Sequence, residues 1–382
     1  MSARCDSPGG GYRAASGRAG TPLLSFGAVK ALILSGGQGT RLRPITHTSA
    51  KQLVPIANKP ILFYGIEAVV AAGITDIGII TGETGPEVRA AVGDGSRFGA
   101  TVTFIPQEAP LGLAHAVLTA RAWLGDDRFV MYLGDNLIRD GITEFVEEFR
   151  RSGPDAEILL ARVPEPERFG VAELSEGRVT RLVEKPPVPL SDLALVGVYL
   201  FSPRVFDAIE RIPYSARGEL EITDAIQRMI DDGAEVLPHV ITGWWKDTGR
   251  LEDMLEANRI ILDTLVPAMD GEVGDGVSLE GRVVVQKGGR LRSCRVRGPA
   301  IIGAGALVEY AYIGPFTSVG AGCVIRGAEV ENSIVLERSV IDGVEGTIDS
   351  SLIGKECVVL RSTSRPRAHR LMLGDQSRVE LG

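Results

Sequence analysis

The stretch LILSGGQGTRLRPIT, residues 32–46, places three glycines, a threonine and two arginines directly after an aliphatic run. Glycines at a strand end let a phosphate approach backbone N–H groups closely, and Arg41 adds a planar guanidinium that stays charged. A dinucleotide-binding fingerprint would need glycine or alanine at Leu42. A Walker A loop would need lysine and then serine or threonine in place of Thr40 and Arg41. The stretch therefore indicates a phosphate loop of another kind, with a simple tight turn as the alternative.

The distribution of charge favours an anionic ligand at this loop. The chain of 382 residues has a net charge of −8, which argues against a general nucleic-acid-binding protein. Between Asp6 and Glu67, however, the sequence has no acidic residue. The same segment contains seven basic residues: Arg13, Arg18, Lys30, Arg41, Arg43, Lys51 and Lys59. A basic segment around a glycine loop in an acidic protein indicates a small anionic ligand.

Further residues that could handle phosphates and metals occur at predicted strand ends and turns. Lys51 and Gln52 lie just downstream of the loop in AKQLVPIANKP, and Gln107 ends a predicted strand in FIPQEAPLGLAHA. Asp135 ends another strand in MYLGDNL, where a carboxylate is a typical Mg²⁺ ligand. Asp247 lies in the turn GWWKDTG. Each residue alone is more often a cap or turn residue, so the prediction depends on the whole set.

The elements that must position these residues alternate between strands and helices over residues 28–265. Short apolar runs predict strands, and amphipathic segments between them predict helices. The predicted strands are 29–34, 76–81, 101–105 and 128–135, and the predicted helices are 60–73, 87–93 and 113–125. This alternation predicts βαβ units and a doubly wound, Rossmann-like α/β domain.

The pattern changes over residues 271–360, which are rich in glycine and valine. Aliphatic residues recur there every six residues, at Ile301, Leu307, Ile313, Val319, Ile325, Val335, Ile341, Ile353 and Val359, with Thr347 filling a gap. A hexapeptide repeat predicts a parallel, left-handed β-helix in which the repeat residues stack inward. A chance run in a β-sandwich is the alternative. Residues 1–27 are expected to be a disordered extension and residues 361–382 a C-terminal tail.

Composition predicts a globular cytoplasmic protein. Hydrophobic residues make up 44% of the chain and charged residues 24%, as in ordinary soluble domains. No apolar run approaches the roughly 18 residues of a membrane helix, so we expect no membrane partner. The four cysteines form no CxxC pair, which favours reduced thiols over a zinc site or disulfide framework.

Six motifs in order carry a family resemblance: GGQGTRLRP with KQL, PQEAPLGLAHA, LGDN, VEKP, RGELEITD and WKDTG. From Val29 onward the chain resembles the nucleotide-sugar pyrophosphorylases, and among them the long glucose-1-phosphate thymidylyltransferases with a C-terminal β-helix. The resemblance implies that a sugar-1-phosphate oxygen attacks the α-phosphorus of a nucleoside triphosphate and expels pyrophosphate. The expected small-molecule partners are dTTP, glucose 1-phosphate and a dTDP-sugar, with Mg²⁺ as cofactor, in a homo-oligomeric enzyme.

The resemblance also implies roles for individual residues. Arg41 would hold the departing phosphates, Lys51 would neutralise the triphosphate, and Asp135 and Asp247 would ligate Mg²⁺. Gln107 would read the pyrimidine edge, and Gln52 would contact the deoxyribose. Lys185 and Arg217 would hold the sugar phosphate, while Glu184 and the backbones of Gly170 and Val196 would bind hexose hydroxyls. The nucleotide-binding set is Gly36, Gly37, Gly39, Thr40, Gln52, Gln107 and Gly112, and the sugar-phosphate set also includes Asn136.

Other interpretations stay open at this point. VEKP and RGELEITD are also compatible with a plain strand end and a plain helix start. An acyltransferase β-helix would need a histidine base, and residues 271–360 contain none, so we expect a structural or oligomeric role for the β-helix. A regulatory homologue without turnover, or an enzyme using UTP or making an ADP-sugar, are further alternatives. Phe169, Lys246 and Ser35 depart from the short family members and leave the choice of sugar and nucleotide open.

Overall fold

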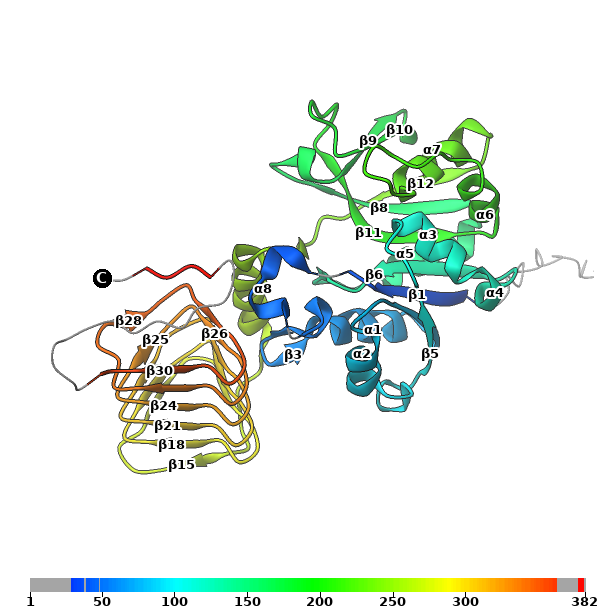
Figure 1. Cartoon of the computed structure of the whole chain (residues 1–382). Helices are drawn as coiled ribbons and strands as arrows, with labels where there is room; N and C mark the ends of the chain where they lie inside the picture. Colours follow the sequence, from blue (N-terminus) through cyan, green and yellow to red (C-terminus); the bar gives the residue numbers. More distant parts are fainter. Residues whose placement is uncertain (1–28, 38, 48, 363–376, 381–382) are drawn as a thin grey trace, which may run out of the picture.

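The computed structural model describes residues 29–37, 39–47, 49–362 and 377–380. The predicted extension over 1–27 and most of the predicted tail over 361–382 lie outside these residues. The described chain forms an α/β domain and a stack of flat coils, joined by helix α8 (Leu251–Thr264) (Figure 1). None of the helices in these ranges combines the length and the apolar character of a membrane span.

A nine-stranded sheet forms the centre of the α/β domain, in the order β10-β9-β11-β6-β1-β4-β5, with β8 and β12 joined to it through β11. Strands β6, β1, β4 and β5 are parallel, whereas β11 pairs antiparallel with β6, β8 and β9. The strands are β1 (Val29–Ser35), β4 (Asp76–Thr81), β5 (Thr101–Pro106), β6 (Arg128–Leu133), β8 (Ala156–Arg162), β9 (Gly170–Ser175), β10 (Arg178–Glu184), β11 (Leu193–Phe201) and β12 (Val236–Val240). The predicted doubly wound α/β fold is confirmed, with an antiparallel extension.

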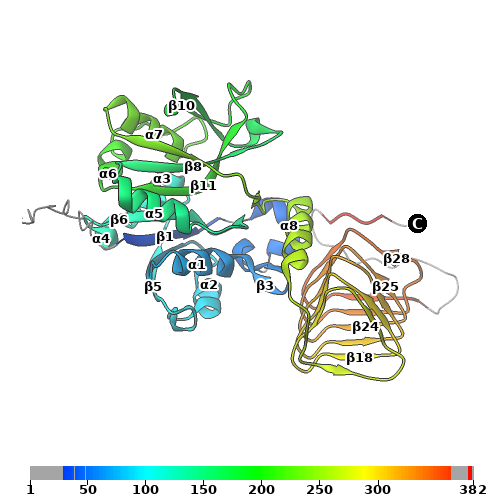
Figure 2. The same cartoon turned by 180° about the vertical axis from the view of Figure 1, so that it is seen from behind.

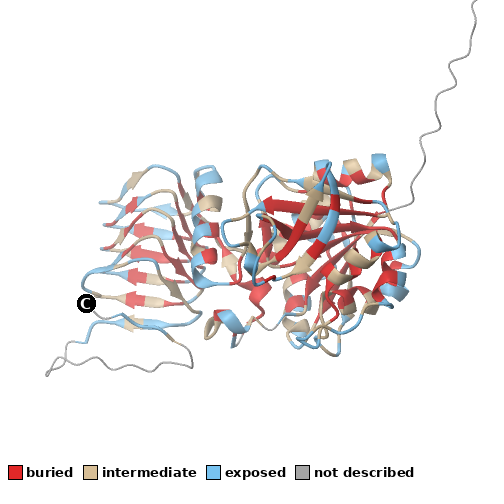
Figure 3. Ribbon diagram, turned by 90° about the horizontal axis from the view of Figure 1, so that it is seen from above, coloured by how far each residue is buried: buried red, intermediate tan, exposed pale blue. Residues whose placement is uncertain are grey.

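Helices cover both faces of this sheet because strand residues alternate between the faces. Leu32 of β1 joins the core beneath α3, α6 and α7, whereas Ile33 joins the core beneath α1, α2 and α5. Figure 3 shows these strands as the most buried part of the domain. The helices are α1 (Ile61–Ala71), α2 (Gly85–Val92), α3 (Leu113–Thr119), α4 (Arg121–Leu124), α5 (Thr143–Ser152), α6 (Arg204–Ile209) and α7 (Ile222–Asp231).

The single helix predicted over 113–125 is wrong in one respect, because it is broken at Ala120. The Ala120 N–H is shared between the Ala116 and Val117 carbonyls, at 3.3 and 3.1 Å, and the Trp123 N–H bonds back to Ala120. The backbone hydrogen bonds there span three residues instead of four, so α4 begins as a separate turn.

Short elements near the ends of the central strands complete the domain. Strand β7 (Asn136–Ile138) pairs antiparallel with β13 (Trp245–Asp247), with Asn136 opposite Asp247. Three single-turn 3-10 helices follow β1, over Thr40–Leu42, Ile45–His47 and Lys51–Leu53, and β2 (Pro55–Ile56) then pairs with β3 (Lys59–Pro60). The β7–β13 pair brings two segments more than 100 residues apart to one place.

The C-terminal coils form three parallel sheets, so the predicted parallel β-helix is confirmed. Each strand hydrogen-bonds to the strand one coil further on, as β17 does to β20 and β20 to β23. The strands are β14 (Ala268–Met269), β15 (Glu272–Val273), β16 (Ser278–Glu280), β17 (Val283–Val285), β18 (Arg290–Arg292), β19 (Arg295–Arg297), β20 (Ala300–Ile302), β21 (Leu307–Glu309), β22 (Tyr312–Ile313), β23 (Thr317–Val319), β24 (Val324–Arg326), β25 (Glu329–Val330), β26 (Ile334–Val335), β27 (Val340–Asp342), β28 (Thr347–Ile348), β29 (Leu352–Ile353) and β30 (Val358–Leu360).

The predicted phase of the repeat is wrong at its beginning. Ile302 and Val308, not Ile301 and Leu307, lie in the coil core with Ile313 and Val319. The inward positions therefore step by six, five and six residues, because one corner of the coil is a residue shorter. Ile301 points outward instead and packs against Ala57 and Leu262. Likewise, Ile348 and not Thr347 packs against the core after Val330.

The β-helix is packed against the α/β domain through α8 and the segment after the glycine loop (Figure 2). Leu42 and Ile56 share an apolar cluster with Ile334 and Leu336 of the coils. Asn258 of α8 is buried at the junction and makes hydrogen bonds to both sides. Its Oδ1 accepts from the Ala57 N–H at 2.9 Å and the Ser318 hydroxyl at 2.6 Å, and its Nδ2 donates to the Phe316 carbonyl at 3.0 Å.

Candidate functional site

A cavity of about 250 Å³ lies at the carboxyl ends of the central parallel strands, where open α/β sheets bind their ligands. It is lined by Leu34, Gly36, Gly37, Gln52, Ile80, Gln107, Pro110, Gly112, Leu113, Ala116, Leu133, Asp135 and Glu219. Six of the predicted site residues therefore surround one cavity. The other predicted residues lie in two neighbouring groups, one next to Asp135 and one reached through Glu219.

The first group is a buried charge cluster built on Lys51, Asp135 and Asp247. The Lys51 side chain is 6% exposed, and its ammonium forms an ion pair with Asp135 and lies 3.6 Å from Asp247 Oδ1. Asp135 follows β6 and Asp247 ends β13, so the β7–β13 pairing holds both carboxylates in place. The Thr248 N–H and hydroxyl both donate to the Asp135 carbonyl, at 3.2 and 2.8 Å. The cluster is therefore fixed by backbone pairing as well as by charge.

Burial and charge act in opposite directions on these groups. Burial opposes ionisation of Asp135, but the Lys51 ammonium outweighs it and holds the pKa of Asp135 below its usual value. Burial and then the Asp135 carboxylate raise the pKa of Asp247. The pKa of Lys51 is raised, because Asp135 and Asp247 together overcome its burial. Within the buried cluster one ammonium thus faces two carboxylates, which leaves an excess of negative charge there; the exposed Arg41 adds a smaller positive contribution from the loop.

This excess suits a divalent cation. Asp247 Oδ1 is buried and has no hydrogen-bond partner among the described residues. An orphaned carboxylate oxygen beside a second carboxylate is the oxygen-rich environment that Mg²⁺ prefers. Asp135 and Asp247 therefore fit the predicted metal-binding role.

Arg41 lies beside this cluster in the 3-10 helix over Thr40–Leu42, and both Thr40 and Arg41 are exposed. A side chain at Gly249 would come within 3.0 Å of the Arg41 guanidinium, so this glycine makes room for it. Gly39 has a φ of 64°, and a Cβ there would meet the Lys51 Cβ at 2.8 Å. Glycine at position 39 thus lets the loop turn directly over Lys51.

Another set of predicted residues, which includes Gln107 and Gly112, lines the cavity itself. Gln107 Nε2 lies 2.8 Å from His115 Nδ1 and 3.5 Å from the Gly112 carbonyl. A Cβ at Gly36 would lie 3.3 Å from Gln107 Oε1, so the loop and this amide face each other. With Nε2 engaged, Gln107 Oε1 lies on the side of the glycine loop. His115, which sequence reasoning missed, therefore orients the amide; its place three residues after Gly112 was the available signal.

Gln52 and the remaining glycines adjoin this region. A Cβ at Gly37 would lie 3.7 Å from Gln52 Nε2, and Gln52 Oε1 is buried without a hydrogen-bond partner in the described chain. Gly112 has a φ of 107°, and a Cβ there would lie 2.4 Å from the Leu220 carbonyl. The close approach of two backbones therefore requires glycine at position 112.

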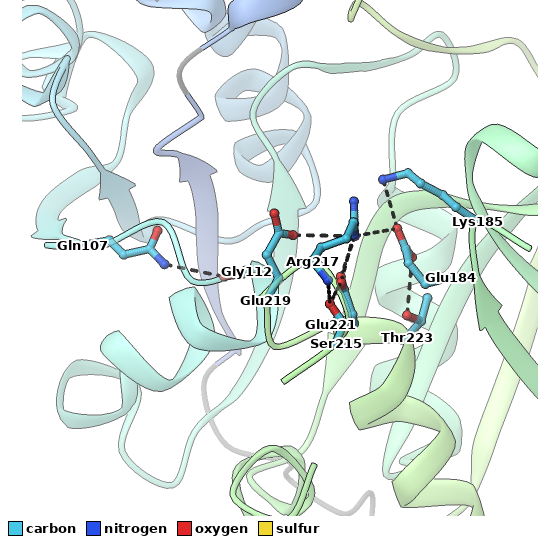
Figure 4. Close-up of polar contacts among 9 residues, drawn as sticks. All are labelled: Gln107, Gly112, Glu184, Lys185, Ser215, Arg217, Glu219, Glu221 and Thr223. Carbon is cyan, nitrogen blue, oxygen red and sulfur yellow. Dashed lines mark hydrogen bonds and ion pairs between the residues drawn. The ribbon is translucent and has the colours of Figure 1, made fainter. Parts of the chain in front are cut away.

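The second of the two neighbouring groups gathers around Arg217 (Figure 4). Its guanidinium contacts Glu184 at 3.3 Å, Glu219 at 3.5 Å and Glu221 at 2.8 Å. Lys185 lies 3.1 Å from Glu184, which also accepts from the Thr223 hydroxyl at 3.3 Å. The predicted residues Glu184, Lys185 and Arg217 are thus together. Their carboxylate partners Glu219 and Glu221 were missed, although RGELEITD places Glu221 four residues after Arg217.

An aromatic pair supports the segment between the charge cluster and the Arg217 group. Asn136 is buried; its Nδ2 donates to Asp135 Oδ1 at 3.1 Å, and its Oδ1 accepts from Trp245 Nε1 at 2.6 Å. The Phe169 ring packs edge-on against Trp245 at 5.2 Å. Phe169, which departs from the short family members, therefore packs against Trp245 and supports its hydrogen bond to Asn136. Trp245 itself was missed, since a tryptophan beside a predicted ligand looks like core.

The two backbone positions predicted for the hexose lie on neighbouring strands. A Cβ at Gly170 would meet Leu195 and Thr223 at 2.7 Å, so β9 passes close to α7. Val196 of β11 is fully buried and lies where the pairing of β11 with β8 is interrupted. Its backbone thus belongs to an irregular part of the strand.

Of the two other departures from the short family members, Lys246 has a local role, and nothing in the structure explains Ser35. Lys246 forms ion pairs with Asp253 at 3.3 Å and Glu256 at 2.5 Å, so its charge ties β13 to α8. Ser35 is buried at the end of β1, and its hydroxyl has no partner among the described residues.

Comparisons with known proteins agree with this geometry. The family model for nucleotidyl transferases matches residues 30–264. The chain is 57% identical over 354 residues to a glucose-1-phosphate thymidylyltransferase of Streptomyces griseus, which covers 92% of this chain and 99% of that one. It is 58% identical over 355 residues to the protein of the same name in Streptomyces antibioticus, with the same coverage. A Bacillus anthracis crystal structure assigned as a glucose-1-phosphate thymidylyltransferase, in complex with sucrose, superposes with a TM-score of 0.59 at 37% identity, covering 63% of this chain and 98% of that one.

Proposed function

The chain belongs to the nucleotidyl transferase family, within the long glucose-1-phosphate thymidylyltransferases, and from this premise we propose that it joins glucose 1-phosphate to dTTP. The products are dTDP-glucose and pyrophosphate. The observation that supports the proposal is the buried Lys51 between Asp135 and Asp247, with Asp247 Oδ1 lacking a hydrogen-bond donor among the described residues. This arrangement suits a reaction in which charge builds up on a phosphorus centre.

The charged residues divide the work of phosphoryl transfer. Asp135 and Asp247 would hold Mg²⁺, which when bound spreads the negative charge of the reacting phosphates. Lys51 adds a positive charge fixed by burial, and Arg41, exposed at the edge of the loop, would hold the leaving pyrophosphate. No side chain needs to act as a nucleophile, because orientation and charge neutralisation supply the catalysis.

The substrates would lie along the line from the cavity to the Arg217 group. The N–H groups of the glycine loop and the amides of Gln52 and Gln107 receive the nucleoside. Arg217 and Lys185 receive the sugar phosphate, and Glu184 receives the hexose hydroxyls. Because Gln107 Nε2 is engaged by His115, the amide offers its oxygen as an acceptor; this oxygen has no donor among the described residues and is suited to an N3–H of thymine or uracil. This supports a pyrimidine over a purine.

A pyrophosphate-release assay with Mg²⁺ and glucose 1-phosphate tests the proposal by comparing dTTP, UTP, ATP and GTP. We expect the highest kcat/KM with dTTP. Equal use of UTP would leave the chemistry in place and change the nucleotide assignment. A folded protein that binds dTDP-glucose but releases no pyrophosphate with any pair would instead be a regulatory homologue. Homo-oligomerisation stays a prediction, which sedimentation of the full chain tests.

A further inference from the structure

Three ligand-type side chains gather away from the nucleotide cavity, on Glu148, Glu157 and His239. Glu157 belongs to β8 and His239 to β12, which in the described part of the chain pairs with β8 alone and forms an edge of the sheet. Leu237 lies opposite Glu157, so His239, two residues further on, projects from the same face of the sheet. Helix α5 carries Glu148 across this face and packs there through Phe145 and Phe149. Three elements thus converge on one position.

The distances between the ligand atoms suit a metal ion. His239 Nδ1 lies 2.7 Å from Glu148 Oε2 and 3.9 Å from Glu157 Oε1, and all three atoms lie within 4.8 Å of one another. Ligand atoms of a tetrahedral zinc ion, with bonds of about 2.0–2.1 Å, lie roughly 3.3 Å apart. The observed separations fall on either side of that value. Phe145 packs edge-on against the His239 ring at 5.4 Å, which restricts its orientation.

Glu157 is the independent sign that a cation is needed. The residue is 1% exposed, and neither carboxylate oxygen has a hydrogen-bond partner in the described chain. A buried carboxylate without a donor is unfavourable unless it is protonated or coordinates a metal.

We propose that Glu148, Glu157 and His239 form a binding site for a divalent transition-metal ion, with Zn²⁺ as the fitting ion. Two carboxylates and one imidazole neutralise a divalent cation and leave a fourth position for water. The imidazole disfavours Mg²⁺ and Ca²⁺, which prefer oxygen ligands only. An ion there ties α5 to the edge strand β12. The site is therefore structural and separate from the Asp135–Asp247 pair.

Metal binding to the full chain tests this inference. Protein stripped of metal is titrated with Zn²⁺ by calorimetry, and with Co²⁺ by visible absorption, which reports tetrahedral coordination. Wild type, Glu157→Gln and His239→Gln are compared with Glu147→Gln, which removes an exposed carboxylate from the same helix. Asp135→Asn separates this site from the metal position of the proposed function.

We expect one Zn²⁺ per chain in the wild type, Glu147→Gln and Asp135→Asn proteins, and at least a tenfold weaker affinity in Glu157→Gln and His239→Gln. Saturating Zn²⁺ should raise the Tm of the wild type by roughly 3 °C or more. In chelator, Glu157→Gln should melt no lower than the wild type, which shows that it still folds. Equal Zn²⁺ affinity in wild type and both ligand variants would overturn the inference. A wild-type protein that binds no Zn²⁺ would also overturn the inference, because a proton shared between these side chains would then take the place of the metal ion.

Discussion

The two ends of the proposed active site differ in how their charges are held. At the metal end, the Lys51, Asp135 and Asp247 side chains are 6%, 22% and 23% exposed, and paired strands fix both carboxylates. At the sugar-phosphate end, the Arg217 and Lys185 side chains are 43% and 47% exposed and contact several carboxylates. The metal end is thus assembled before substrate arrives. In the proposed reaction, the sugar-phosphate end exchanges carboxylate contacts for phosphate contacts.

This difference predicts which kinetic parameter each end controls. Groups held in place act on the reacting centre and should change kcat. Groups that must give up a partner to bind substrate should change KM for that substrate. The following variants test the division, beginning with the largest expected effect on turnover.

Replacement of Asp135 by Asn should have the largest effect. The substitution keeps the shape of the side chain but removes a proposed metal ligand and the partner of Lys51. We expect turnover to fall by about 10³-fold or more, while dTTP binding, measured by calorimetry, survives in part. Asp140→Asn is the matched control, because Asp140 is exposed and pairs only with Arg139 among the described residues. Unchanged turnover in Asp135→Asn would remove the metal assignment.

Replacement of Lys51 by Gln should separate charge from position at the same end. Without the ammonium, Asp135 and Asp247 face each other unneutralised, and we expect kcat to fall by roughly 10²-fold. Breaking a buried ion pair should also lower the free energy of unfolding by up to about 3 kcal/mol in chelator. Mg²⁺ should restore part of that loss, because it neutralises the same carboxylates.

Chemical denaturation with and without Mg²⁺, together with pyrophosphate release, measures both effects of Lys51→Gln. Lys59→Gln is the control, since the half-buried Lys59 pairs with Glu67 outside the site. If Mg²⁺ gives Lys51→Gln no more stabilisation than it gives the wild type, the ion does not bind between these two carboxylates.

Replacement of Arg217 by Gln should change binding more than chemistry. Loss of charge-assisted hydrogen bonds to a phosphate should raise KM for glucose 1-phosphate by at least about tenfold, with KM for dTTP within twofold. Arg211→Gln, which removes an exposed arginine paired with Asp232, is the control. A parallel rise in both KM values, or a fall in kcat alone, would erase the distinction between the two ends.

The structure brings together the residues that the sequence analysis assigned to each end, but the contacts that make the two ends different could not be predicted. Local patterns placed Asp135 after a strand and Arg217 before a helix, because strand and helix signals are local. The orientation of Gln107 by His115 and the support of Asn136 by Trp245 depend on tertiary packing, which a single sequence does not encode as a motif. The carboxylate at Glu157 interrupts an apolar strand, yet its partners lie 9 and 82 residues away in the chain.

The six-residue repeat of the β-helix also shows what a single sequence does not predict. Its spacing identified the architecture, because every coil needs aliphatic residues at regular intervals. The phase was wrong at Ile301 and Leu307, since a shorter corner shifts the inward position to Ile302 and Val308. Ile301 then became available to pack on α8. Aliphatic residues form both the core of the coils and the surface that joins the two domains. Composition alone therefore could not distinguish an inward position from a position at the junction.

The junction between the two domains provides the test with the smallest expected effect on turnover. Leu336 of the coils packs in one cluster with Leu42, the residue after Arg41. Leu336→Ala should lower the free energy of unfolding by about 2–5 kcal/mol, and it should loosen the loop at the metal end only. We therefore expect a modest fall in kcat, about threefold by the displacement of Arg41, with KM for glucose 1-phosphate unchanged. Leu360→Ala, at an exposed coil position, is the control. A variant that melts lower but keeps full kcat would show that the metal end is rigid without the β-helix.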